Sequence, residues 1–393
     1  MRVLLVHNRY RSGAPGGEDL VFDQELNYLR CAGFEVAVYE RSNDEMSDRN
    51  PFDVMRVMAS LWGSSRTRND LSGIIRGFKP DVAHFHNLFP LIGVSAFETC
   101  SKMNVPVVAT IHNYRLVCAA ATHFRDGQVC AACSSRSVLQ AVTHRCYRKS
   151  AAASAVVAAS ISRAWRSGVY EHHVSRFIVL TEFASQWLQG QGISKHKIRI
   201  KPNAIANIEP NGTPRGNYVV FSGRLSIEKG LWTLLDAWGH LPEVPLKVVG
   251  SGPLEQELRK FAATRRMPIE FLGYLPHEQT LRVVSAARAV VVPSLWFEGM
   301  PLSILEAWAC GTPVVGTRLG GIAELLGADE RGLTFPAGDG VGLAAAVKKL
   351  LADPDLATRL VNAAHQRLME AHSVTSTVSS LQQIYREVVR CVA

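Results

Sequence analysis

Two glutamates flank a predicted helix start in the stretch FEGMPLSILEAWACGTPVV (297–315). Pro301 suits the first position of a helix, and Gly311 with the proline after it ends one, so we expect a helix over about 301–310. Glu298 precedes this helix and Glu306 lies inside it. Eight residues of ideal helix rise about 12 Å, which is close to the distance between the sugar and the ribose of a nucleotide sugar.

The start of this helix is a predicted anion site. Its unpaired backbone N–H groups, near Gly299, Met300, Leu302 and Ser303, lie at the positive end of the helix dipole, where a diphosphate would bind. A buried, unpaired Glu306 would cost several kcal/mol, so it needs a partner. The spacing alone leaves that partner open between a ligand hydroxyl and a neighbouring backbone N–H.

A second stretch, FSGRLSIEKG (221–230), places two cations in one loop after a predicted strand. Arg224 and Lys229 could neutralise a leaving diphosphate without a metal ion. Exposed loop cations are also common where no ligand binds, and this motif by itself decides neither interpretation.

The elements that carry these motifs alternate between short β-branched runs and segments of helical period, which predicts an α/β protein with parallel sheets and helices on both faces. The two series of runs are separated by a linker rich in Pro, Asn and Gly at 201–217. The predicted strands lie at 3–6, 35–40, 81–86, 106–112 and 176–181, and then at 217–223, 246–250, 269–274, 289–294 and 312–317.

The length of 393 residues predicts two domains. The formal charge of +9 is confined to the first part, because residues 1–206 hold 25 Lys and Arg against 16 Asp and Glu, and the rest holds 18 of each. This excess favours an anionic membrane surface or a phosphorylated acceptor as a partner, or else a solvated basic face without one. Nucleic acid is not expected, because no basic run alternates with aromatic residues.

The N-terminal apolar run, MRVLLV, is too short for a signal peptide, and no window is long enough to span a membrane. We therefore expect a cytoplasmic protein. A segment at 145–170 has basic residues around an apolar, alanine-rich helix, which fits either peripheral contact with the inner face of the membrane or a helix packed in the core.

Taken together, the motifs resemble those of the retaining glycosyltransferases of family 4, which have the GT-B fold. The resemblance rests on Glu-x7-Glu in EGMPLSILE, Gly-Arg-x4-Lys-Gly in GRLSIEKG, and the stretches KPNAI (201–205), VVGSGP (248–253) and GTPVVGTRLGGIAELL (311–326). It implies two Rossmann-like domains facing an interdomain cleft: an acceptor domain at 1–203 and a nucleotide-sugar domain at 204–373, followed by a helix at 374–393 that crosses back to the first.

The resemblance also implies roles for individual residues. Glu298 would hold donor-sugar hydroxyls, Glu306 the ribose, and Arg224 with Lys229 the diphosphate. The base would lie near Gly250, Tyr274 and Leu275. The remaining donor-binding positions implied are Asn203, Gly223 and the helix start at 299–303.

In the first domain, GAPGGED (13–19) follows the first strand and opens a helix. Gly16 and Gly17 allow close backbone approach to a phosphate or sugar, and the family has a Gly-Gly loop here that faces the acceptor and the donor phosphate, which implies a donor-binding role for both. His112 matches a family histidine that contacts the donor sugar, whereas its sequence context alone favours a strand-end residue that caps a loop. For His84 and His86 we expect structural roles.

The implied reaction needs no catalytic metal. Front-face departure and attack, with the leaving phosphate taking the acceptor proton, leaves positioning and charge stabilisation to the protein. The sequence DPD (353–355) is expected in a late turn between helices. The donor would be a UDP- or GDP-sugar, and the acceptor a polysaccharide, a lipid-linked glycan or a small molecule.

An insertion at about 115–150 holds Cys118, Cys130, Cys133 and Cys146 in the pattern C-x11-C-x2-C-x12-C. Four such cysteines in a loop-rich segment predict a structural zinc site. Reduced thiols without metal are the second interpretation, and disulfides are the least favoured in a cytoplasmic protein.

Two other functions share this architecture. One is a sugar-nucleotide epimerase, which would need carboxylates arranged for proton or elimination chemistry. The other is a non-catalytic sugar-nucleotide-binding protein. A module that binds only sugars would not need the diphosphate cations. A dinucleotide oxidoreductase is disfavoured, because GSGPLE (250–255) lacks the third glycine of that fingerprint.

Overall fold

The computed structural model describes residues 1–12, 16–46, 63–206 and 215–390. Part of the predicted glycine loop, part of the predicted linker and the last three residues of the predicted C-terminal helix lie outside these ranges. The chain forms two compact units. The first comprises residues 1–123, 130–201 and 377–393, and the second comprises 202–376 with Phe124–Val129.

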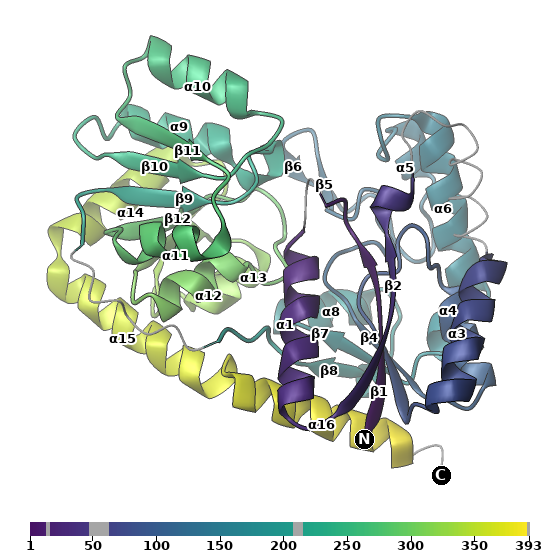
Figure 1. Ribbon diagram of the computed structural model, residues 1–393. Coiled ribbons are helices and arrows are strands. Elements are labelled where there is room, and N and C mark those ends of the chain that lie inside the picture. Colours follow the sequence, from purple (N-terminus) through teal and green to yellow (C-terminus); the bar gives the residue numbers. More distant parts are fainter. Residues whose placement is uncertain (13–15, 47–62, 207–214, 391–393) are drawn as a thin grey trace. The chain divides into compact units, whose positions relative to one another are not determined.

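The first unit is built on a six-stranded parallel sheet (Figure 1). The strand order is β2 (Glu35–Ser42), β1 (Arg2–Arg9), β3 (Val82–Phe85), β4 (Val107–Thr110), β7 (Arg176–Val179) and β8 (Ile198–Ile200). The central strands β3 and β4 are buried at every position, as expected of parallel strands covered on both faces.

Two apolar clusters lie on opposite faces of this sheet, because successive residues of a strand alternate between the faces. Leu4 and Val6 of β1 belong to one cluster, and Val3 and Leu5 belong to the other. The helices of this unit are α1 (Gly17–Cys31), α3 (Ser65–Phe78), α4 (Ser95–Lys102), α5 (Gln140–Thr143), α6 (Ala151–Arg166), α7 (Val169–His172), α8 (Glu182–Gly190) and most of α16 (Val374–Arg390).

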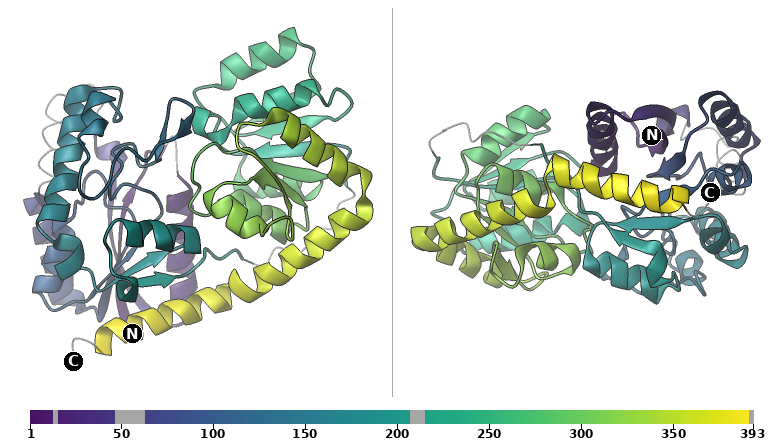
Figure 2. Two further views of the ribbon diagram at one scale, coloured as in Figure 1. Left: turned by 180° about the vertical axis from the view of Figure 1, so that it is seen from behind. Right: turned by 90° about the horizontal axis from the view of Figure 1, so that it is seen from below.

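Helix α16 packs on the first unit together with α1. Its residues Leu381, Tyr385 and Val388 are buried in the same cluster as Val3 and Leu5. Figure 2 shows this helix, in yellow, lying along the first unit close to the N-terminus. The C-terminal segment therefore completes one face of the N-terminal sheet.

The second unit has a six-stranded parallel sheet of its own. The strand order is β11 (Ile269–Gly273), β10 (Leu246–Val249), β9 (Val219–Ser222), β12 (Ala289–Val292), β13 (Val314–Thr317) and β14 (Leu333–Phe335). The helices are α9 (Leu231–Gly239), α10 (Glu255–Thr264), α11 (His277–Ser285), α12 (Leu302–Ala309), α13 (Gly320–Leu326), α14 (Gly340–Ala352) and α15 (Pro354–Ala371).

Both sheets confirm the predicted α/β class with parallel strands. The remaining elements are a hairpin of β5 (Phe124–Arg125) and β6 (Gln128–Val129), and 3₁₀ turns at Asn43–Glu45, Lys195–Lys197 and Ile227–Lys229. Within the described residues, no helix is both long enough and apolar enough to cross a membrane. In each unit the loops that follow the strands lie at the carboxyl edge of the sheet, where ligands of such folds bind.

Candidate functional site

The structure brings the Glu298 motif and the Arg224–Lys229 motif of the second unit close together. Glu298, in the loop after β12, is 6% exposed. Its Oε1 accepts hydrogen bonds from Lys229 Nζ at 2.6 Å and from Ser294 Oγ at 2.8 Å. Because β9 and β12 are neighbours in the sheet, the loops after them bring these side chains to one point.

Arg224 lies in the same loop as Lys229, five residues earlier. Its side chain is exposed, and it has no hydrogen bond or ion pair with any other part of the chain that the structure describes. The loop thus presents one cation already paired with a carboxylate and one that remains available to an anion.

Helix α12 begins one residue later than predicted, so that Pro301 is its N-cap and Leu302 its first residue. Glu306 lies within it and is 8% exposed. No backbone N–H donates to its carboxylate among the described residues, and its ion-pair partner is the exposed His277, with Nδ1 at 3.5 Å from Oε1. Burial raises the pKa of Glu306, and His277 opposes this only in part. A neighbouring backbone N–H therefore does not satisfy this carboxylate.

Glycines allow the backbones of neighbouring loops in the second unit to approach each other closely. Gly250 has φ +125°, and a Cβ there would lie 2.0 Å from the carbonyl oxygen of Gly223. A Cβ at Gly321 would lie 2.5 Å from the carbonyl oxygen of Gly299. Side chains at these positions would push apart the loops that hold Arg224 and Glu298.

The other predicted donor-binding residues lie near these loops. The backbone N–H of Asn203 donates to Met300 Sδ at 3.2 Å, and Asn203 Oδ1 is buried without a partner among the described residues. Gly250 N–H donates to Gly273 O at 2.7 Å, next to Tyr274, which is 68% exposed, and Leu275. An exposed aromatic ring beside a glycine-lined loop suits the flat face of a base.

In the first unit, Gly16 is the N-cap of α1 and Gly17 its first residue. Asp19 closes the helix start, because its Oδ2 accepts from Gly16 N–H at 3.0 Å. Its Oδ1 lies 2.8 Å from His7 Nε2. The predicted glycine pair is thus held at the carboxyl end of β1.

His112 follows β4 and is part of a buried polar network that the sequence did not reveal. Its Nε2 lies 3.0 Å from His86 Nδ1, and His86 Nε2 lies 3.2 Å from Glu25 Oε1. Lys201 Nζ donates to Glu25 Oε2 at 2.6 Å. His86 therefore does more than the predicted structural role, since it connects His112 to a buried ion pair.

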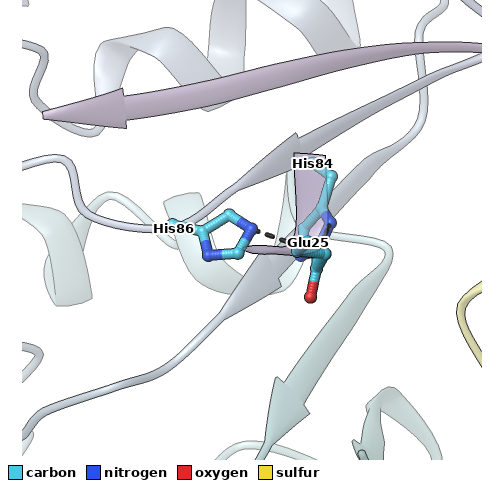
Figure 3. Close-up of side chains that lie close together, drawn as sticks. All are labelled: Glu25, His84 and His86. Carbon is cyan, nitrogen blue, oxygen red and sulfur yellow. Dashed lines mark hydrogen bonds and ion pairs between the residues drawn. The ribbon is translucent and has the colours of Figure 1, made fainter. Parts of the chain in front are cut away.

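His84, in contrast, fits its predicted structural role. Its ring nitrogens lie 2.7 Å from Tyr385 Oη and 2.7 Å from Thr110 Oγ1. Among the described residues, Glu25, His84 and His86 form the one group of three metal-ligand types whose ligand atoms all lie within 4.8 Å of one another (Figure 3). The ammonium of Lys201 is bound to the same carboxylate, so this group is satisfied by the protein itself.

Burial sets the charge states in this network. It lowers the pKa of His86 to about 4, although Glu25 opposes the shift. Burial, and then the unfavourable interaction with His86 that charging both rings would bring, lowers the pKa of His112 well below its usual range. Burial by itself would raise the pKa of Glu25, but Lys201, His84 and His86 together hold it well below its usual range. At neutral pH the network therefore has a carboxylate, an ammonium and neutral imidazoles at His86 and His112.

We expect this network to make the protein sensitive to acid. The pKa of His86 falls from 6.5 unfolded to about 4 folded, so the unfolded state binds an additional proton between these values. The free energy of unfolding is then lost as the pH falls from 6.5 to 4, by up to about 1.4 kcal/mol per pH unit for this one group. Urea unfolding across this range should show a shallower pH dependence for His86→Gln. The matched control is His196→Gln, at an exposed histidine of the same unit, and an unchanged slope in His86→Gln would contradict the assignment.

A cavity of about 100 Å³ opens beside His112. Glu18, His86 and Asn113 contribute polar groups to its lining, and Val157 and Ile161 of α6 contribute apolar ones. Such mixed linings fit molecules that combine hydroxyl groups with apolar C–H faces.

The four predicted zinc ligands lie together in the segment between β4 and α6. None of them is in a disulfide. Burial, and then the neighbouring Cys118, Cys146 and Cys130, raises the pKa of the Cys133 thiol to about 11. The Asp-x-Asp sequence has a structural use, since Asp353 Oδ1 accepts from Leu356 N–H at 2.8 Å and caps α15.

Two family models together match most of the chain. Residues 15–206 match the model described as Glycosyltransferase Family 4, and residues 205–367 match the model described as Glycosyl transferases group 1. The glycogen synthase of Mycobacterium tuberculosis is 28% identical, over 98% of this chain and 94% of its own length. Two solved structures share the fold. Sucrose-phosphate synthase from Thermosynechococcus elongatus has a TM-score of 0.71 and 19% identity, with 99% of each chain covered. Anabaena HepE in complex with UDP has a TM-score of 0.68 and 16% identity, with 98% of this chain and 100% of that chain covered.

Proposed function

The chain belongs to the family 4 glycosyltransferases of GT-B fold, and we propose that it transfers a hexosyl group from a UDP- or GDP-sugar with retention of the anomeric configuration. The family and the fold confirm what the sequence motifs predicted. The donor, the acceptor and the stereochemistry are proposals that rest on the residues described above.

The observation that carries this proposal is the group of charges after β9 and β12. Lys229, paired at 2.6 Å with the buried Glu298, and the exposed Arg224 lie in loops that follow neighbouring strands. Fixed cations of this kind stabilise the charge that develops on a leaving diphosphate. A protein that only bound sugars would have no need for them.

The two glutamates support a position for the donor. We assign the donor-sugar hydroxyls to Glu298 and the ribose to Glu306, with the diphosphate at the start of α12 between them. Anabaena HepE has been solved with UDP and with UDP-glucose, which supports a nucleotide-sugar donor here. Asn203, Gly223, Gly250, Tyr274 and Leu275 would complete the donor site on the second unit.

Transfer would proceed on one face of the sugar. The bond between the anomeric carbon and the phosphate oxygen breaks while the acceptor oxygen bonds to the same face, and the leaving phosphate takes the acceptor proton. Arg224 and Lys229 would stabilise the leaving group, and we assign to His112, which is neutral at pH 7 and lies 3.0 Å from His86, the contact with the donor sugar that the family resemblance implies. The charge on the diphosphate is thereby balanced by side chains, and we propose no catalytic metal.

For the acceptor we propose a polysaccharide, a lipid-linked glycan or a small molecule that binds the first unit near Gly16, Gly17 and His112. The basic excess of residues 1–206 would support peripheral contact with an anionic membrane on the cytoplasmic side. Sedimentation with anionic vesicles, compared with neutral ones, tests that contact.

The reaction is tested by measuring release of nucleoside diphosphate from UDP- and GDP-sugars with candidate acceptors. Nuclear magnetic resonance of the product should show the anomeric configuration of the donor, and inversion would exclude the proposed mechanism. Conversion of one free sugar nucleotide into its epimer would favour the epimerase. Tight nucleotide binding without release from any donor would favour a binding protein.

Glu306→Gln should weaken nucleotide binding without destabilising the fold. A charged acceptor contributes about 1.5–3 kcal/mol through its hydrogen bonds, so the Kd of UDP or GDP should rise roughly 10- to 150-fold. The pKa of Glu306 is raised by burial, so ionisation in the folded state opposes folding above the usual carboxyl pKa, and removing the charge should leave Tm equal or higher at pH 7. Calorimetric titration and thermal unfolding measure the two effects. The control is Glu324→Gln, and an unchanged Kd in Glu306→Gln would refute its role.

A further inference from the structure

Four cysteines lie on three turns of the segment between β4 and α6. Cys118 N–H donates to Tyr114 O at 2.9 Å, and Cys118 O accepts from Ala121 N–H at 2.9 Å, which closes the first turn. Cys130 N–H donates to His123 O at 2.6 Å beyond the β5–β6 hairpin. Cys146 N–H donates to Ala141 O at 3.0 Å after α5. The backbone thus holds Cys118, Cys130 and Cys146 in short turns, and Cys133 follows Cys130 outside any helix or strand.

These turns converge on one small apolar cluster. Its buried members are Ala119, Val138, Ala141, Val157, Ala158 and Ile161, and the half-buried Cys133 and Cys146 pack against it. Its buried side chains are small or of medium size, and the segment has little regular structure besides the hairpin and the four-residue α5. The side chains of Phe89, Tyr147 and Trp165 also pack against the cluster, so the loops are anchored on one side by apolar contacts. Regular secondary structure adds little to their order, and loop-rich modules commonly use a metal or disulfides for stability.

We propose that Cys118, Cys130, Cys133 and Cys146 bind one structural Zn²⁺ ion as thiolates. All four positions would be filled by sulfur, which is the closed tetrahedral arrangement of structural zinc and leaves no position open for catalysis. Binding releases the four thiol protons to solvent and leaves a site with a net charge of −2.

The charge of the segment matches such a site. Residues 115–149 contain the basic residues Arg115, Arg125, Arg136, Arg145, Arg148 and Lys149 and the single acidic residue Asp126. A bound metal cation would offset the burial that raises the pKa of the Cys133 thiol, and the basic surroundings would help to balance the negative charge of the four thiolates. Disulfide bonds carry no charge, so the surrounding positive charge would not stabilise them.

Metal binding would tighten the segment. No three of the four sulfurs lie within 4.8 Å of one another in the structure. Zn–S bonds of about 2.3 Å place the sulfurs of a tetrahedron about 3.8 Å apart. Zinc would therefore draw the sulfurs closer together, through rotation of the cysteine side chains and movement of the turns, so that zinc binding and the final ordering of these loops are one process.

The site also has a consequence for the cavity beside His112. Val157 and Ile161 belong both to the apolar cluster under the cysteines and to the lining of that cavity. Ordering of the cysteine segment would therefore set one wall of the cavity. The zinc assignment itself does not depend on the proposed transfer reaction.

The test is the metal content of the full chain purified under reducing conditions. Inductively coupled plasma mass spectrometry should find about one zinc per chain, and X-ray absorption should show about four sulfur neighbours at about 2.3 Å. Cys133→Ser should lose most of the zinc. The exposed Cys31→Ser is the matched control and should retain it, since Cys31 lies in α1, away from the segment.

Three results would overturn the proposal. The first is that the purified chain contains iron and shows its charge-transfer band in the visible range. The second is that all four cysteines of the native chain react with a thiol reagent and no metal is released. The third is an X-ray absorption spectrum in which nitrogen or oxygen atoms are the zinc ligands. If Cys133→Ser fails to fold, the absorption spectrum of the unmodified chain still decides. A Co²⁺-substituted chain gives a second readout, because tetrahedral Co²⁺ with thiolate ligands absorbs in the visible range.

Discussion

Lys201→Met should lower the free energy of unfolding by about 3–5 kcal/mol, because removing one partner of a buried ion pair leaves the other charge uncompensated. Lys201 and Glu25 have side chains that are each 2% exposed, and their charged atoms lie 2.6 Å apart. The neutral imidazole of His86 cannot replace the ammonium as a counter-charge. Urea unfolding at pH 7 measures the loss.

A double-mutant cycle separates the ion pair from the packing of the lysine chain. Glu25→Gln combined with Lys201→Met should recover much of the lost stability, since no buried charge remains. The exposed Lys195→Met is the matched control, and it should change stability by less than about 0.5 kcal/mol. A loss below about 1 kcal/mol in Lys201→Met would show that water or a shifted charge state already relieves Glu25.

The strands show why most of the fold could be predicted from the sequence. Each of the ten predicted runs overlaps a strand of the two parallel sheets, because buried parallel strands are continuous apolar runs. The edge strands β8 and β14 were missed. Each has three residues, too few for a pattern to be visible, and each gains its backbone partners from a longer neighbouring strand.

The candidate site of the second unit could be predicted from the sequence because each motif is a short continuous stretch of residues. Lys229 and Glu298 are 69 residues apart, but each lies in the loop after a strand that the sequence predicted, and the two strands are neighbours. Gly321 was recognised only as part of a motif. Its physical reason, close approach to the backbone of Gly299, needed coordinates.

The network behind His112 could not be predicted in this way. Glu25 and Lys201 are separated by 176 residues, and each would pass for a surface charge. The one local signal is the spacing of Phe22, Glu25 and Leu29, which puts the glutamate on the buried face of α1. Nothing local identifies its partner, because Lys201 follows a strand that was itself missed.

Lys229→Met should reduce kcat for transfer by about 10²- to 10³-fold, which is the usual effect of removing one donor that stabilises charge in a transition state. The side chain of Lys229 is 24% exposed, so it can reach both Glu298 and a ligand. The KM for the donor should change much less than kcat, because the cation interacts most strongly with the phosphate as it leaves.

The control for this prediction is Lys247→Met, which removes a half-buried lysine of the same unit that pairs with Glu270. It should leave kcat unchanged. Lys229→Arg should keep part of the activity, since a cation remains in the loop. If the pair with Glu298 had only a structural role, Lys229→Met would lower Tm and leave kcat of the folded fraction unchanged. If kcat of Lys229→Met stays within about threefold of that of the unmodified enzyme, Lys229 does not stabilise the leaving group. That role would then belong to Arg224 and the start of α12, which are the remaining positive groups of the site.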